Sequence, residues 1–237
     1  MATAHCEWGP NGVLAYRERV KVLVIVDVLS FSTAVDIAVA RGAYIVPLPL
    51  GDRDAAAKAA AEAGAVLASA TRAGGQYSLA PSSLESILAG AKLLLPSPNG
   101  SRLSLMGGDA VVFAGCLRNA AAVAGAALGA AQGGDIAVIP AGERWRADDS
   151  LRPAIEDLIG AGAILDALDL ELSPEARVAR DAYRSARSTL AETVRQSISG
   201  RELIERGFPR DVELAVEANV STAAPCVVDG VYRVSNA

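Results

Sequence analysis

Short apolar runs alternate with longer segments of helical spacing along most of the chain. The runs contain many β-branched residues and few polar ones, which is typical of strands buried on both faces. We therefore predict strands over residues 21–27, 43–48, 65–68, 92–95, 110–114 and 135–140. The segments between them predict helices over residues 34–41, 52–63 (with Asp52 as N-cap) and 119–131, and a further helix from about 151 to 168. This alternation favours a three-layer α/β/α fold around a largely parallel or mixed sheet.

The two ends of the chain depart from this alternation. Residues 5–12 contain a Gly-Pro-Asn-Gly turn and predict an irregular or edge segment. After Leu170 the pattern predicts a helical stretch, followed by a hairpin at the edge of the sheet with Asp229-Gly230 as a type I′ turn. We predict one α/β domain over residues 1–237, in which residues 171–220 either join the main body or form a helical subdomain.

Charge and composition narrow the classes of function. The 237 residues carry a net charge of −5 and form no basic cluster, which argues against nucleic acid as a partner. The N-terminus lacks a signal-peptide pattern and the apolar runs are too short to span a membrane, so we expect a cytoplasmic protein. Three scattered cysteines and one histidine, His5, argue against disulfides, zinc and Ser-His-Asp chemistry. Oligomeric state stays open, a homo-oligomer included.

Carboxylates, hydroxyls, amides and arginines collect after the predicted strands, where an open α/β sheet forms its ligand crevice. Oxygen ligands of this kind suit a hard cation, most simply Mg²⁺. Asp27 ends a fully apolar strand, so it is either a rigidly held metal ligand or nucleophile, or a helix cap. Glu156 and Asp157 point about 100° apart on a helix, and either reach the same crevice or lie on its solvated face.

The central loop after the strand at 92–95 combines turn residues and hydroxyls with Asn99, Gly100 and Arg102. Backbone N–H groups, hydroxyls and one guanidinium make an environment suited to a phosphate group. An ordinary strand-to-helix turn has the same composition and is the commoner occurrence of such a motif.

Several of these stretches together resemble the 2-phosphosulfolactate phosphatase (ComB) family. The resemblance rests on the following stretches: Asp27-Val-Leu-Ser-Phe-Ser-Thr33, Pro98-Asn-Gly-Ser-Arg102, Gly115-Cys-Leu-Arg-Asn-Ala120, Glu156-Asp157-Leu-Ile-Gly-Ala-Gly162 and Val228-Asp-Gly-Val231. It implies a Mg²⁺-dependent acid phosphatase, a phosphoric monoester hydrolase that releases sulfolactate from a small anionic ester, 2-phosphosulfolactate, on a route to coenzyme M.

The resemblance also implies roles for individual residues. The catalytic set is Asp27, Asn99 and Arg102, and Mg²⁺ is held by Asp27 with Glu156 or Asp157. Substrate contacts are expected from Ser32, Thr33, Arg72, Ser97, Gly100, Ser101, Arg118 and Asn119. The Arg72 or Arg118 side chain would receive a second anionic group of the substrate.

The chain departs from the family pattern around the expected pocket. Thr71 stands where the family usually has an acidic residue, Ala80-Pro81-Ser82-Ser83 replaces Gly-Asn-Ser-Pro, and Pro96-Ser97-Pro98 replaces a threonine-rich run. These changes keep a second hypothesis open, a non-catalytic small-anion binding protein that retains the fold. A dinucleotide-dependent oxidoreductase is disfavoured because the chain has no Gly-rich dinucleotide fingerprint.

Overall fold

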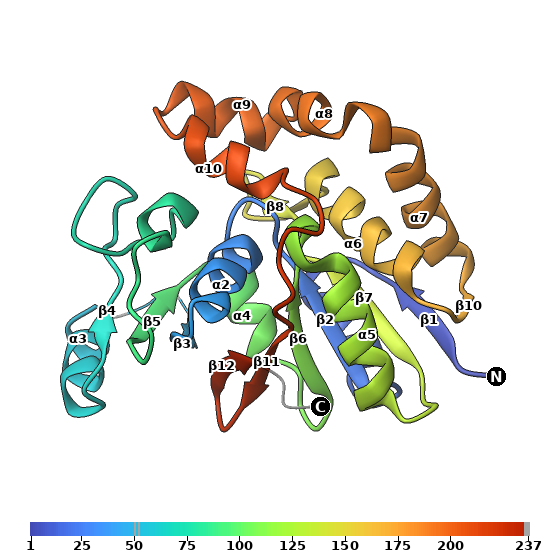
Figure 1. Ribbon diagram of the computed structural model, residues 1–237, viewed down its shortest axis with the longest axis horizontal. Helices are drawn as coiled ribbons and strands as arrows, with labels where there is room; N and C mark the ends of the chain where they lie inside the picture. Colours follow the sequence, from blue (N-terminus) through green and yellow to red (C-terminus); the bar gives the residue numbers. More distant parts are fainter. Residues whose placement is uncertain (50, 52, 235–237) are drawn as a thin grey trace.

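The computed structural model describes residues 1–49, 51 and 53–234. Its main strands are β1 (Thr3–Cys6), β2 (Val22–Val26), β3 (Tyr44–Leu48), β4 (Val66–Leu67), β5 (Lys92–Pro96), β6 (Val111–Gly115), β7 (Ile136–Pro140), β10 (Glu171–Leu172), β11 (Pro225–Val228) and β12 (Val231–Val234). Among the described residues these form one ten-stranded sheet in the order β10-β1-β7-β2-β6-β11-β12-β3-β5-β4 (Figure 1). A separate short hairpin joins β8 (Glu143–Arg144) to β9 (Leu151–Arg152).

The helices are α1 (Gly9–Tyr16), α2 (Phe31–Ala40), α3 (Arg53–Glu62), α4 (Gly100–Ser104), α5 (Ala120–Ala131), α6 (Ile155–Ala167), α7 (Pro174–Ala186), α8 (Leu190–Gln196), α9 (Ile198–Glu205) and α10 (Pro209–Ala215), with 3₁₀ turns η1 (Pro81–Leu84), η2 (Leu117–Asn119) and η3 (Arg187–Thr189). Helices α8, α9 and α10 lie together above the sheet in Figure 1. In the described part of the chain, no helix has both the length and the apolar character that a membrane span needs.

The sheet consists of two parallel groups joined by an antiparallel hairpin. Strands β10, β1, β7, β2 and β6 are parallel, as are β3, β5 and β4. The hairpin β11–β12 lies between the groups and pairs antiparallel with β6 through Cys226 and with β3 through Tyr232. The predicted class, a largely parallel or mixed sheet between helical layers, is confirmed.

Strand β2 shows why the helices cover both faces of the sheet. Val22, Val24 and Val26 join a core cluster with residues of α5, α6 and α7, whereas Leu23 and Ile25 join a second cluster with residues of α1, α2 and α4. A strand that buries alternate side chains against two helical layers must be apolar at every position, as this one is.

The structure corrects three local predictions. Residues 5–12 are not an irregular edge: β1 pairs on both sides, with β10 and β7, and α1 follows with Pro10 in its first turn, where proline is tolerated because the N–H there is unpaired anyway. The central loop contains the short helix α4. The Asp229-Gly230 turn has positive φ at both residues, which confirms type I′ geometry, but the hairpin lies inside the sheet rather than at its edge. The proposed cap Asp52 lies outside the described residues.

Candidate functional site

Asp27 lies at the carboxyl end of β2, on the floor of a cavity of about 400 Å³. Its Oδ1 accepts a hydrogen bond from the Phe31 N–H (3.2 Å), and its Oδ2 accepts one from the Gly100 N–H (2.9 Å). The first bond engages the first N–H of α2, whose N-cap residue is Ser30 and not Asp27, and the second links the loop after β2 to the start of α4. Asp27 therefore accepts hydrogen bonds from the first N–H groups of two helices while it borders the cavity.

The cavity walls come from loops that are far apart in the sequence. They follow β2, β4, β5 and β7 and include the segment after α9. The described lining residues are Asp27, Leu29, Ser30, Ser69, Ala70, Thr71, Arg72, Ala73, Leu79, Ser97, Pro98, Asn99, Glu143, Arg206 and Phe208. The predicted residues Asp27, Arg72, Ser97 and Asn99 are thus brought together, with two carboxylates and two guanidiniums around one space.

Arg72 is held in the wall by two buried partners. Its Nη1 donates to Asp211 Oδ2 (2.9 Å) and its Nη2 donates to Ser30 Oγ (2.8 Å). Asp211 is fully buried on α10, and its other oxygen accepts the Ser82 N–H at 3.0 Å. Since both ends of the guanidinium are fixed, Arg72 presents a positive charge to the cavity in one orientation.

Burial makes the two carboxylates of the cavity hard to ionise. Burial raises the pKa of Asp27 to about 6, against the opposing effects of the Phe31 and Gly100 N–H groups and of the Arg72 charge. Burial and the neighbouring Asp27 charge raise the pKa of Glu143 to about 7. The Asn99 Nδ2 donates to Glu143 Oε2 (3.1 Å), which links the loop after β5 to the loop after β7. Two carboxylates in this state favour a cation or a proton close by.

Asp157 connects the ends of the two strands that lead into the site. Its Oδ1 accepts the Val28 N–H (2.7 Å) and its Oδ2 accepts the Gly142 N–H (2.9 Å), so both oxygens are engaged by backbone at the ends of β2 and β7. Burial, and the charges of Asp27 and Glu156, raise the pKa of Asp157 well above its usual range. Asp157 and Glu156 are buried beneath the site instead of lying on a solvated helix face.

Several predicted substrate contacts lie in the fold around the cavity. The hydroxyls of Ser32, Thr33 and Ser101 are fully buried and donate to the backbone carbonyls of Ile25, Val28 and Leu95. Outside the cavity, Arg118 pairs with Asp36 (3.0 Å) and with Glu217, and Asn119 bonds the backbone of Cys116 and Ala114. The structure therefore does not bring these five residues into the cavity.

Arg102 also lies apart from the cavity. It follows Gly100 by two positions on α4, about 200° around the helix, so its side chain leaves on another side. It lines a small depression with Arg144 and Leu151, which shares Pro98 and Asn99 with the cavity but does not include Asp27. This differs from the expectation that Arg102 and Asp27 line one site, and among the described lining residues the guanidiniums are those of Arg72 and Arg206.

Glu143, Arg206 and Asp211 were missed as site residues by the sequence reasoning. Glu143 lies three positions after Pro140, the last residue of β7, so a search of the residues that follow each strand would have found it. Arg206 and Asp211 belong to the helical stretch after residue 170, where many charged residues look alike and no local pattern separates these two.

Whether the cavity can hold a metal ion depends on the number of protein ligands that the ion requires. Among the described residues, no group of three His, Cys, Asp or Glu side chains is placed to hold one. Mg²⁺, however, commonly takes one or two carboxylates, with waters and phosphate oxygens completing its shell. Asp27 and Glu143 border the same cavity and fit that donor set, whereas Glu156 and Asp157 are not among its described lining residues.

Comparisons with known proteins agree with one another. A family model described as 2-phosphosulpholactate phosphatase matches residues 11–230. The chain is 31% identical over 227 residues to a probable 2-phosphosulfolactate phosphatase of Carboxydothermus hydrogenoformans, covering 90% of this chain and 91% of that one. It is 28% identical to a protein of the same description from Pseudothermotoga lettingae, covering 88% and 90%. A 2-phosphosulfolactate phosphatase of Methanothermobacter thermautotrophicus is 35% identical over 142 residues, which span 60% of this chain and 58% of that one.

Proposed function

Because the chain belongs to the 2-phosphosulpholactate phosphatase family, we propose that it hydrolyses 2-phosphosulfolactate to sulfolactate and phosphate in the cavity above Asp27, with Mg²⁺ as cofactor. The observation that carries the proposal is the Asp27 carboxylate, fixed by the Phe31 and Gly100 N–H groups at the floor of a cavity that Arg72 and Arg206 also border. Carboxylate and guanidinium around one cleft match the needs of a phosphate ester, whose reaction depends on positioning and charge stabilisation.

In this proposal the arginines of the cavity bind the anionic substrate and the carboxylates hold the metal ion. Arg72, fixed by Asp211 and Ser30, binds an anionic oxygen of the substrate, and Arg206 adds positive charge at the outer wall. Asp27 and Glu143 would hold Mg²⁺, which supplies charge neutralisation at the phosphoryl oxygens. Asn99 keeps Glu143 in place through its amide. This assignment moves the expected metal ligands from Glu156 and Asp157 to Glu143 and gives the phosphate-binding role of Arg102 to Arg72.

Release of inorganic phosphate from 2-phosphosulfolactate, measured with added Mg²⁺ and again with a chelator, tests the proposal. Activity that needs Mg²⁺ and disappears in Asp27→Asn supports it. A matched pair of arginine variants then separates the site from its surroundings. We expect Arg72→Ala to lower kcat/KM by about a hundredfold or more, as the loss of a charge-assisted contact in the transition state does, and Arg102→Ala to stay within about threefold of wild type.

The same experiment distinguishes the alternative of a non-catalytic anion-binding protein. That alternative predicts saturable binding of 2-phosphosulfolactate by calorimetry with no phosphate release at any Mg²⁺ concentration. Loss of activity in Arg102→Ala but not in Arg72→Ala would reject our assignment of the arginines.

A further inference from the structure

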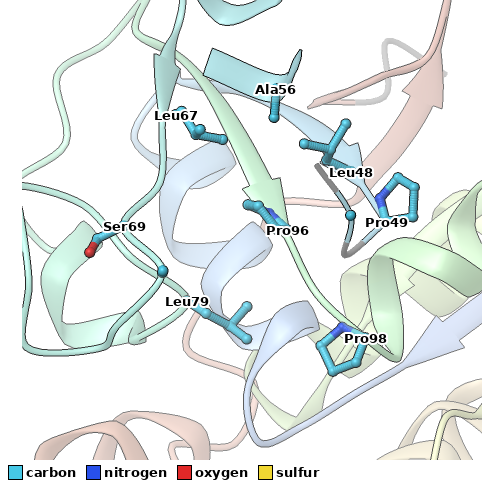
Figure 2. A pocket seen from close by; sticks show the side chains of 10 residues that line it. Leu48, Pro49, Ala56, Leu67, Ser69, Leu79, Pro96 and Pro98 are labelled. Carbon is cyan, nitrogen blue, oxygen red and sulfur yellow. The ribbon is translucent and has the colours of Figure 1, made fainter. Parts of the chain in front are cut away.

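A second cavity of about 330 Å³ adjoins the polar one and has a different chemical character (Figure 2). We call it the apolar annex. Its described lining residues are Leu48, Pro49, Gly51, Ala56, Leu67, Ser69, Ala70, Leu79, Pro96 and Pro98, and among these Ser69 alone has a polar side chain. Figure 2 shows the leucine and proline side chains arranged around this space, on strands β3, β4 and β5 and the loops that follow them.

The annex and the polar cavity share part of their lining. Ser69, Ala70, Leu79 and Pro98 line both spaces, so they form the boundary between them. A ligand whose anionic groups contact Arg72 and Arg206 would reach the annex by extending past this boundary. Apolar side chains bordering such an opening gain free energy when an apolar group of the ligand displaces water from them.

The proposed substrate has nothing to place there. 2-Phosphosulfolactate carries phosphate, carboxylate and sulfonate groups on a three-carbon chain, and each of these charged groups loses hydration against an apolar wall. The annex is also large enough for a ring, since an apolar cavity of about 150 Å³ in another protein holds benzene. The size and polarity of the annex therefore fit a phosphate ester that carries an apolar group better than they fit 2-phosphosulfolactate.

Resting on the proposed function, we infer that the chain also accepts phosphate esters of 2-hydroxy acids that bear an apolar side group, with that group in the annex. The reaction is unchanged: a water oxygen forms a bond to phosphorus, the ester P–O bond breaks, and the leaving alkoxide takes a proton to give the hydroxy acid and inorganic phosphate. The carboxylate and phosphate stay in the polar cavity with Arg72 and Arg206, and the annex determines which side groups bind tightly.

Two esters that differ only in the apolar group test the inference: the 2-phosphate of lactate and the 2-phosphate of 3-phenyllactate. We expect a KM about tenfold or more lower for the phenyl ester, as for burial of one aromatic group. Ala56→Trp, which fills the annex from α3, should remove that advantage and leave KM for phospholactate unchanged. Ala59→Trp, at an exposed position of the same helix, is the matched control and should behave as wild type.

A second variant guards against misfolding of the first. Leu67→Asp places a charge in the annex and should also raise KM for the phenyl ester alone, with circular dichroism and melting temperature as checks on the fold. Equal KM values for the two esters in wild type, or equal effects of Ala56→Trp on both, would overturn the inference. If wild type hydrolyses neither ester nor 2-phosphosulfolactate, the proposed function fails. Calorimetry with the same two esters then still tests whether the annex binds an apolar group: tighter binding of the phenyl ester supports this role, and equal binding rejects it.

Discussion

Replacing Arg72 and Asp211 singly and together measures how strongly helix α10 holds the wall of the cavity. The Arg72 side chain is 12% exposed and that of Asp211 is 0% exposed, and their atoms lie 2.9 Å apart. Arg72→Met leaves the Asp211 carboxylate buried, with the Ser82 N–H still donating to it. Asp211→Asn leaves a guanidinium facing an amide that can accept from either Ser82 or Arg72 but not from both.

The magnitude follows from the cost of a buried unpaired charge. Removing one partner of a buried pair costs about 3–5 kcal/mol, and we expect about 2–3 kcal/mol for each single variant, because Arg72 borders an open cavity. The double variant keeps one amide oxygen for Ser82 and leaves no charge unpaired, so it should cost about as much as either single variant. The coupling free energy is then about 2–3 kcal/mol, and each single variant should melt roughly 5–10 °C lower.

Urea unfolding of the four proteins, in buffer free of phosphate and sulfate, gives the coupling energy directly. The surface pair of Arg210, also on α10, with Glu85 is the matched control, with a contact of 2.7 Å between half-exposed side chains. Its cycle should give about 0–1 kcal/mol, because solvent screens exposed pairs. Additive effects in the Arg72–Asp211 cycle, within error of the control cycle, would refute the view that this pair supports the cavity.

Three further outcomes are expected. Gly100→Ala places a Cβ 2.2 Å from a Phe31 ring atom, so the start of α4 must shift; we expect activity to fall at least tenfold in the phosphate-release assay, and wild-type activity would contradict this. Glu143 has a raised pKa of about 7 in the folded protein, so its contribution to stability is present at low pH and is lost as pH rises toward that value. In metal-free buffer, wild type should therefore lose about 1–3 kcal/mol relative to Glu143→Gln between pH 5 and 8, as measured by urea unfolding, and parallel pH profiles would contradict this. Gly162→Ala places a Cβ 2.1 Å from the Ala179 carbonyl oxygen; we expect a loss of about 2 kcal/mol or more by thermal melting, and an unchanged melting temperature would show that α6 and α7 can separate freely.

Features that depend only on residues adjacent in the sequence were predictable. The apolar run of β2 and its terminal Asp27 fixed one strand, its burial on both faces and the position of a carboxylate at the sheet edge. The Asp229-Gly230 turn was predictable for the same reason, since both residues tolerate positive φ. What the turn could not reveal was the hairpin's neighbours, because pairing with β6 and β3 depends on residues more than a hundred positions away.

Side chains of the right chemical type were harder to assign to the site. Ser32 and Thr33 have hydroxyls close to Asp27 in sequence, yet in the fold both hydroxyls donate hydrogen bonds to backbone carbonyls. The Arg118 guanidinium is similarly engaged in ion pairs with Asp36 and Glu217. Whether a polar side chain is free for a ligand depends on its partners in space. A single sequence shows the chemistry of each group but leaves those partners hidden.

The supports of the cavity link its assembly to the packing of the whole chain. Asp157 on α6 joins the ends of β2 and β7, and Asp211 on α10 fixes Arg72 in the loop after β4. Neither carboxylate lines the cavity, and both are buried. The loops that border the cavity are therefore positioned by residues that do not line it, so the lining residues can change the shape and polarity of the wall at little cost to its support. Under the proposed function, Thr71, Ser97 and the apolar annex would set the specificity for the side group, and Arg72, which α10 holds, would supply a charged contact for phosphate.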